Sequence, residues 1–361
     1  MLIITSIYCL LIMKLSIIIP YYNILKELDR CLKSLSEQTI IKDYFEVLVI
    51  DSCSLIKPDS IIKKYKNKLT NLKVFKLRKN QGPGIARNLG IKKSLGEYIF
   101  FLDADDILPN HSLKKIYKLI LEKNVDIITF NWSYLNKKKY VLKRLRKDHK
   151  YLTFNKIKLI KTYISMHYNL SVIFCVSKKN IFIKNNIKFS SGLHEDIAVL
   201  FQMYFFATKI YYTNEILYLK ENRKGSIVNT FSPKHINDFF KSWVTIKDII
   251  IKNKSLTFFN NHLIKFYIKG ILGLLSMVII KNRTINKNIK SKKYFYYGII
   301  AKEFKKFYLK DIQGHTLPYK TKYDQISSIF LKYYLFEKKK YIYKRNQLYE
   351  KEILQKKLLS S

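Results

Sequence analysis

The chain has 361 residues, of which 48% are hydrophobic and 26% are charged. This balance excludes a disordered chain, because a protein of this size and hydrophobic content buries a core, and the length corresponds to about two domains. Lys and Arg number 68 against 26 Asp and Glu, which gives a net charge of +42. That charge attracts any polyanion, whether nucleic acid, an anionic membrane or a phosphorylated metabolite, so it selects no function by itself.

The first 13 residues are apolar, but they are too few to span a bilayer, which takes about 20 residues. Lys14 follows them directly and no small-residue cleavage site precedes it, so no secretion signal is predicted. Two interpretations stay open: residues 1–13 are a mis-assigned start before a true initiator at Met13, or they are a short membrane-surface anchor. The four cysteines form no metal-site or disulfide pattern, as expected in a reducing cytoplasm.

Apolar runs and amphipathic helices alternate through the first third of the chain. The apolar runs are typical of buried parallel strands, and leucines at three- and four-residue spacing indicate a helix between the first two runs. This alternation predicts β-α-β units and an α/β fold with a mostly parallel sheet flanked by helices. We expect strands at 15–19, 44–50, 73–77, 98–102 and 125–132, and helices at 25–35, 60–68 and 85–94.

Polar side chains follow the ends of several of these strands. Asn23 follows the first strand, Asp51 ends the second, and Asp103, Asp105 and Asp106 follow the fourth. Ligands of parallel sheets bind at the carboxyl ends of the strands, so these side chains are predicted to share one edge. Two carboxylates spaced by one residue can hold Mg²⁺ or Mn²⁺ and leave positions open for phosphate oxygens. The local alternative is a solvated turn with Asp106 as a helix N-cap.

Four short motifs stand in order between residue 14 and about residue 110. They are Ser16–Asn23 (SIIIPYYN), Val47–Asp51 (VLVID), Gly82–Gly90 (GPGIARNLG) and Gly96–Asp106 (GEYIFFLDADD). In this order they resemble the nucleotide-binding half of the inverting family 2 glycosyltransferases, which have the GT-A fold. The resemblance implies transfer of a sugar from a nucleoside diphosphate sugar, with a UDP-sugar as the expected donor, to a growing bacterial surface glycan such as capsule or lipooligosaccharide.

The resemblance also implies how the donor is bound. Pro20, Tyr22 and Asp51 are expected against the base and ribose, while Asp105 and Asp103 meet the diphosphate through Mn²⁺ or Mg²⁺. The alternative for Tyr22 is simple aromatic packing. Many relatives carry two successive acids after the second strand, whereas here Ser52 follows Asp51, which leaves the base specificity open.

Arg87 stands just after the glycine-rich turn that opens the third expected helix. A cation at such a turn is suited to face phosphate, so Arg87 is a second-rank candidate for nucleotide binding. The alternative is an ordinary surface charge on a helix.

A second acidic pair, Glu195 and Asp196, opens an apolar stretch that is predicted to be a helix through Phe206. The local alternative is that both acids stand in the first turn of this helix because negative charge there complements the helix dipole. In the family, however, a Glu-Asp pair about ninety residues after the D-x-D motif commonly supplies the catalytic base. We therefore expect Asp196 to be the base, with Glu195 as the fallback, because a carboxylate can accept the proton of an attacking hydroxyl. His194 is expected to lie beside these acids without taking part in the chemistry.

Arg223 and Ser226 resemble a late family segment that approaches the leaving group. The alternative for this segment is a basic hairpin loop. The resemblance thus adds two candidate leaving-group contacts to the site.

The alternation stops beyond about residue 235, where basic, aromatic-rich segments of helical period begin. We expect a glycosyltransferase domain at 14–235, with a nucleotide-binding half (14–125) and an acceptor half (126–235), and a helical C-terminal region at 236–361. Such a region suits an anionic membrane surface, although solvated helices are the alternative. The expected location is therefore cytoplasmic and peripheral, on the inner face of the bacterial inner membrane, facing a lipid-linked glycan or oligosaccharide acceptor.

Other classes of protein fit the sequence less well. A sugar-1-phosphate nucleotidyltransferase would carry a Gly-rich, Arg-containing segment after the first strand, where Pro20, Tyr22 and Asn23 stand instead. A nucleic-acid-binding protein would explain the charge, but strand-end acids repel phosphate unless they bind metal, so no nucleic-acid partner is expected. An inactive sugar-binding relative would lack metal-dependent donor hydrolysis.

Overall fold

The structure is a computed structural model, which describes part of the chain. The whole chain divides into two compact units, Met1–Lys269 and Gly270–Ser361. All described residues lie in the first unit, and within them no helix is long and apolar enough to cross a membrane. The predictions for the leader 1–13, for Arg223 and Ser226 and for the chain beyond residue 253 lie outside the described residues. The described residues are 14–135, 163, 171–221 and 232–253.

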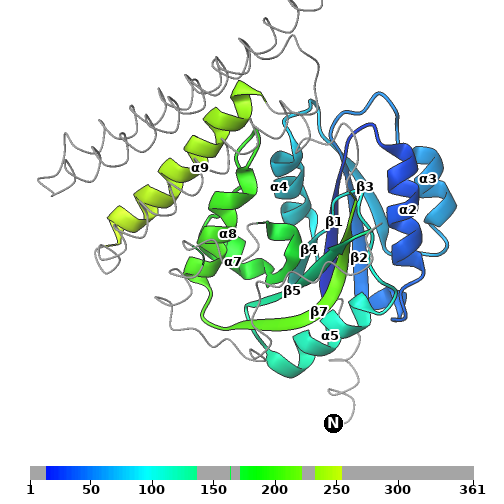
Figure 1. The fold of residues 1–361 in the computed structure, drawn as a ribbon. Helices are drawn as coiled ribbons and strands as arrows, with labels where there is room; N and C mark the ends of the chain where they lie inside the picture. Colours follow the sequence, from blue (N-terminus) through cyan, green and yellow to red (C-terminus); the bar gives the residue numbers. More distant parts are fainter. Residues whose placement is uncertain (1–13, 136–162, 164–170, 222–231, 254–361) are drawn as a thin grey trace, which may run out of the picture. The chain divides into compact units, whose positions relative to one another are not determined.

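In the described part of the chain, a mostly parallel sheet of seven strands in the order β3-β2-β1-β4-β6-β5-β7 forms the centre of the domain (Figure 1). Strand β6 is antiparallel to both of its neighbours, β4 and β5, while the remaining neighbours are parallel. The strands are β1 (Leu15–Tyr21), β2 (Phe45–Asp51), β3 (Leu72–Lys76), β4 (Tyr98–Phe101), β5 (Ile127–Tyr134), β6 (Cys175–Lys178) and β7 (Ile210–Lys220).

Helices lie on both sides of this sheet. Figure 1 shows α2 and α3 together on one side of β1 and β2, and α4 on the other, towards α7, α8 and α9. The α-helices are α2 (Leu25–Ser36), α3 (Asp59–Tyr65), α4 (Pro83–Lys93), α5 (Ser112–Lys123), α7 (Lys179–Lys184), α8 (Glu195–Phe206) and α9 (Pro233–Lys252), and the 3-10 helices are η1 (Lys42–Tyr44) and η2 (Val172–Phe174).

Burial explains why the central strands are mostly apolar. Ile17, Ile18 and Ile19 are all fully buried, because helices cover both faces of β1. In α2, Leu28 and Leu32 are fully buried on one face of the helix, as the spacing predicts. The central strands are thus fixed by burial on both faces, and their carboxyl ends share one edge.

The five strands predicted from the sequence are present as β1 to β5, with ends that differ by two residues at most. The three helices predicted between them are α2, α3 and α4. Strands β6 and β7 and helices α5 and α7 were not predicted. The domain limits stay a prediction: α9 runs through the boundary expected at residue 235 and packs against α8.

Candidate active site

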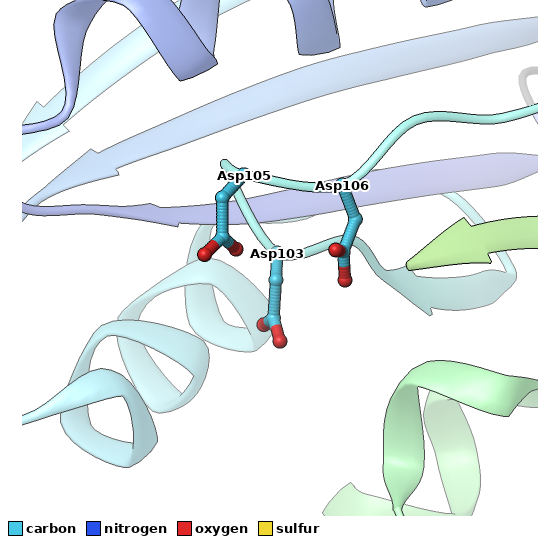
Figure 2. Close-up of side chains that lie close together, drawn as sticks. All are labelled: Asp103, Asp105 and Asp106. Atoms are coloured by element: carbon cyan, nitrogen blue, oxygen red, sulfur yellow. The ribbon is translucent and has the colours of Figure 1, made fainter. Parts of the chain in front are cut away.

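Three carboxylates gather directly after β4. Asp103, Asp105 and Asp106 each offer an oxygen within 4.8 Å of the others, and Figure 2 shows their side chains on the same side of the loop. Asp103 and Asp105 are partly exposed, whereas Asp106 is 1% exposed. Carboxylate oxygens are the ligands that Mg²⁺ and Mn²⁺ prefer, so this set of donors fits a hard divalent cation.

The end of β7 holds Asp106 in place. The Tyr218 hydroxyl donates to Oδ2 of Asp106 at 2.5 Å, and the backbone N–H of Glu221 donates to Oδ1 at 2.7 Å. Burial, reinforced by the charge of Asp103, raises the pKa of Asp106 to about 8. Helix α5 begins only at Ser112, so the interpretation of Asp106 as its N-cap is wrong. Asp106 instead joins the loop that carries Asp103, Asp105 and Asp106, here called the acidic loop, to the end of β7.

Arg87 joins the acidic loop to the N-terminus of α8. Its Nη2 lies 2.8 Å from Oδ1 of Asp103, and its Nη1 lies 2.6 Å from Oε1 of Glu195. Burial by itself would lower the pKa of Arg87, but the negative charges of Asp103 and Glu195 raise it above its usual value. Arg87 is 4% exposed, which rules out a surface helix charge. Its contact with phosphate stays a prediction.

The two acids of the Glu-Asp pair have different surroundings. Glu195 is 7% exposed and bound to Arg87. Burial raises the pKa of Glu195 to about 7, although Arg87 opposes that shift. Asp196 is partly exposed, and its carboxylate makes no hydrogen bond or ion pair within the described part of the chain. Asp196 is therefore the acid of this pair that is available to a substrate.

A glycine at the start of α4 lets the helix approach this pair. A Cβ atom on Gly84 would lie 2.6 Å from the backbone oxygen of Ser190 and 2.7 Å from Cγ of Glu195. We expect Gly84→Ala to lower the free energy of unfolding by about 1–3 kcal/mol, because overpacking forces backbone shifts. Urea unfolding measures the change. Lys92→Ala, at an exposed position of the same helix, serves as the control, and equal stability of the two variants would contradict the close approach.

The nucleotide-binding candidates lie at the ends of β1 and β2. Pro20 pairs with Ile50 and Tyr21 with Asp51 in the parallel register, so Pro20, Tyr22 and Asp51 are brought together at one edge. Tyr22 is 46% exposed, which does not fit simple aromatic packing and leaves its ring open to a ligand. Their contact with base and ribose stays a prediction.

Hydrogen bonds fasten the loop after β2 to the end of β1. Asp51, which is 2% exposed, accepts the backbone N–H of Ser54 at 2.9 Å. Asn23, with φ of 55°, accepts the backbone N–H of Ile56 on its side-chain oxygen at 3.0 Å. Asn23 also donates its own N–H to the Ser54 hydroxyl at 3.2 Å. These bonds join the ends of β1 and β2 into one rim of the site.

Several residues of the site were missed from the sequence. Burial alone would lower the pKa of Lys220, at the end of β7, but the charges of Asp103, Asp106 and Asp105 raise it above its ordinary value. A basic side chain thus stands beside the acidic cluster. No local pattern pointed to Lys220, because Asp103, Asp105 and Asp106 lie more than 110 positions before it in the sequence.

A second missed contact involves α2. Arg30 forms an ion pair with Glu221 and donates to the backbone oxygen of Asp105 at 3.4 Å. The ion pair joins residues 191 positions apart, so no sequence pattern could reveal it. Arg30 and Glu221 tie the acidic loop to α2 and to the end of β7.

Comparison with known proteins agrees with this geometry. Residues 16–181 match the family described as glycosyl transferase family 2. The chain is 35% identical to the poly(ribitol-phosphate) beta-N-acetylglucosaminyltransferase TarP of Staphylococcus aureus (strain N315), over 49% of this chain and 53% of that protein. It spans 22% to 53% of the length of the first curated relatives it matches.

Solved structures share the fold. TarS 1-349 of S. aureus in complex with UDP-GlcNAc is similar with a TM-score of 0.59 and 23% identity, over 84% of this chain and 93% of that one. The mannosyltransferase PcManGT from Pyrobaculum calidifontis, in complex with GDP-Man and Mn²⁺, has a TM-score of 0.52 and 13% identity, over 88% and 80% of the two chains. The sheet and its helices therefore have the predicted GT-A architecture, and residues 16–181 form a glycosyltransferase family 2 domain.

Proposed function

We propose that this chain is an inverting, metal-assisted glycosyltransferase that transfers a sugar from a UDP-sugar to a cell-surface glycan. The observation that carries the proposal is the contact of one guanidinium, that of Arg87, with both Asp103 and Glu195. This contact places the acidic loop after β4 beside the N-terminus of α8, where the Asp196 carboxylate has no partner among the described residues.

Asp196 is the general base in this mechanism. Its carboxylate accepts the proton of an acceptor hydroxyl as the hydroxyl oxygen attacks the anomeric carbon. The bond between that carbon and the diphosphate oxygen breaks on the opposite face, so the configuration inverts and the nucleoside diphosphate leaves with the bonding electrons. Glu195 stays bound to Arg87 and keeps the first turn of α8 in place.

Asp103 and Asp105 would hold the divalent cation, Mn²⁺ or Mg²⁺. When bound, such a cation stabilises the negative charge of the leaving diphosphate as a Lewis acid. The carboxylate chemistry and the 4.8 Å cluster support this assignment, as does the Mn²⁺ in the complex of PcManGT with GDP-Man. Asp106, buried and hydrogen-bonded to Tyr218, keeps the loop in shape.

The donor would lie on the rim formed by the ends of β1 and β2. Pro20, Tyr22 and Asp51 are proposed to contact the base and ribose, and the exposed ring of Tyr22 supports a stacking role. Arg223 and Ser226 are proposed as leaving-group contacts. The UDP-GlcNAc bound by TarS supports a UDP-sugar as the donor.

The acceptor is proposed to be a surface glycan of the capsule or lipooligosaccharide kind, carried on a lipid at the inner face of the membrane. The name of TarP, a transferase that acts on poly(ribitol-phosphate), supports a polymeric surface acceptor. The basic residues interleaved with aromatic ones beyond about residue 235 support attachment to an anionic membrane surface.

Release of nucleoside diphosphate from a panel of nucleotide sugars, with Mn²⁺ or Mg²⁺ and with EDTA, tests the function. We expect turnover of one donor, its loss in EDTA, and a fall of about 10²- to 10³-fold for Asp105→Ala, as when one group that stabilises transition-state charge is removed. Asp59→Ala, at an exposed position in α3, is the control. Absence of turnover with every donor, and of any donor-induced rise in Tm, would refute the proposal.

A further inference from the structure

Helix α9 contacts the turn that leads into α8. It lies beyond residues 16–181, which match the family, and it packs against α8. Two of its side chains, Asp238 and Ser242, are 4% and 5% exposed. Residues four apart lie on the same face of a helix, and here that face meets the residues that precede Glu195.

Both side chains bind the backbone of this turn. Oδ2 of Asp238 accepts the N–H of Leu193 at 3.0 Å, and the Ser242 hydroxyl donates to the backbone oxygen of His194 at 2.7 Å. Both bonds are partly buried, and a polar group that is withdrawn from water destabilises the fold when it loses its partner, so these bonds favour one conformation of the turn.

The conformation that they hold is an unusual one. Gly192 has φ of 123° and His194 has φ of 59°, both in the left-handed half of the backbone map. His194 makes no side-chain capping bond to α8. A non-glycine residue in this conformation persists only when its surroundings determine it. Asp238 packs closely against this turn, because a Cβ atom on Gly192 would lie 2.5 Å from Oδ2 of Asp238.

We infer that Asp238 and Ser242 are positioning residues for Asp196: they fix the turn from Gly192 to His194 and thereby the direction in which the Asp196 carboxylate leaves α8. The inference rests on the proposed function, in which Asp196 is the base. The Asp196 carboxylate makes no hydrogen bond or ion pair with the described residues. The position of this carboxylate therefore depends on the backbone of the first turn of α8.

Asp238 also forms two ion pairs, which the proposed positioning does not require. Lys234 and Lys241 lie 2.7 Å and 3.2 Å from its carboxylate, and their side chains are 59% and 75% exposed. Exposed cations contribute little through such pairs. An Asn at position 238 keeps an oxygen for the N–H of Leu193 but loses the charge, whereas a Leu of similar size loses both. The two variants therefore separate the hydrogen bond from the ion pairs.

The test compares Asp238→Asn and Asp238→Leu in the full chain, with Asp248→Leu, at an exposed position of the same helix, as the control. We expect Asp238→Leu to lower kcat by about 10- to 100-fold with little change in the donor KM, because a small misplacement of a reacting group has effects of this size. Asp238→Asn should keep most of the activity. Amide hydrogen exchange should rise at residues 192–196 in Asp238→Leu alone.

A double-mutant cycle distinguishes positioning from a loss of fold. In an Asp196→Asn background, Asp238→Leu should cause no further fall in kcat, since there is no base left to misplace. An equal fall in both backgrounds, an unchanged kcat in Asp238→Leu, or a loss in Asp238→Asn as large as in Asp238→Leu would overturn the inference alone. Absence of turnover by the native protein would overturn the proposed function and this inference with it.

Discussion

Asp196→Asn is expected to lower kcat by about 10²- to 10⁴-fold, the usual contribution of a general base. The amide has nearly the same shape as the carboxylate but does not accept the proton of the acceptor hydroxyl. Because Asp196 makes no bond to the described residues, its replacement should leave Tm and the donor KM nearly unchanged. Steady-state kinetics with donor and acceptor, together with thermal melting, check both parts.

Glu195→Gln is the matched comparison, since it changes the neighbouring acid in the same way. Glu195 is buried and bound to Arg87, so we expect this variant to lower stability as well as activity. If Glu195→Gln abolished turnover while Asp196→Asn kept it, the base would be Glu195 and the assignment to Asp196 would be wrong.

Arg87→Met is expected to lower the free energy of unfolding by about 3–5 kcal/mol, the effect of removing one partner from a buried ion pair. Glu195 would lose the guanidinium that pairs with its carboxylate, and Asp103 would lose the contact that ties the acidic loop to α4. Arg78→Met, at an exposed position, controls for the loss of one positive charge. Urea unfolding of both variants measures the difference.

The decrease in the free energy of unfolding caused by Arg87→Met should depend on pH. Burial raises the pKa of Glu195 to about 7 in the folded protein, from an ordinary value of 4.5. A carboxyl group whose pKa is raised by folding contributes fully to stability at pH values below its pKa in the unfolded chain. This contribution is lost as the pH rises through its pKa in the folded protein. Arg87 opposes that shift, so without it the cost of ionising Glu195 grows. We expect a larger destabilisation at pH 8 than at pH 5, and a pH-independent loss would contradict the pairing.

The strands and helices around the acidic loop could be predicted because their signals are local. β1 and β2 are largely apolar runs, since both faces are covered, and α2 shows its buried leucines at helical spacing. β6 has only four residues and is antiparallel to both neighbours, so neither its length nor its place follows from the pattern. β7 is partly exposed along its length, and Thr213, Asn214 and Glu215 interrupt its apolar residues.

The sequence by itself determined the α/β class, the motifs that resemble the family and the residues that can carry its chemistry. These features depend on residue type and near-neighbour spacing, which a single chain displays directly. It named Glu195 and Asp196 as a pair, and favoured Asp196 only through the resemblance.

Only the tertiary structure decided how these acids differ. Arg87 is 108 positions from Glu195, and Asp238 is 45 positions from Leu193, so their contacts exist only once α4, α8 and α9 have packed. Burial then pairs Glu195 with a cation and leaves Asp196 partly exposed. The physical reason is that charge pairing and desolvation depend on distance in space, whereas sequence patterns report distance along the chain.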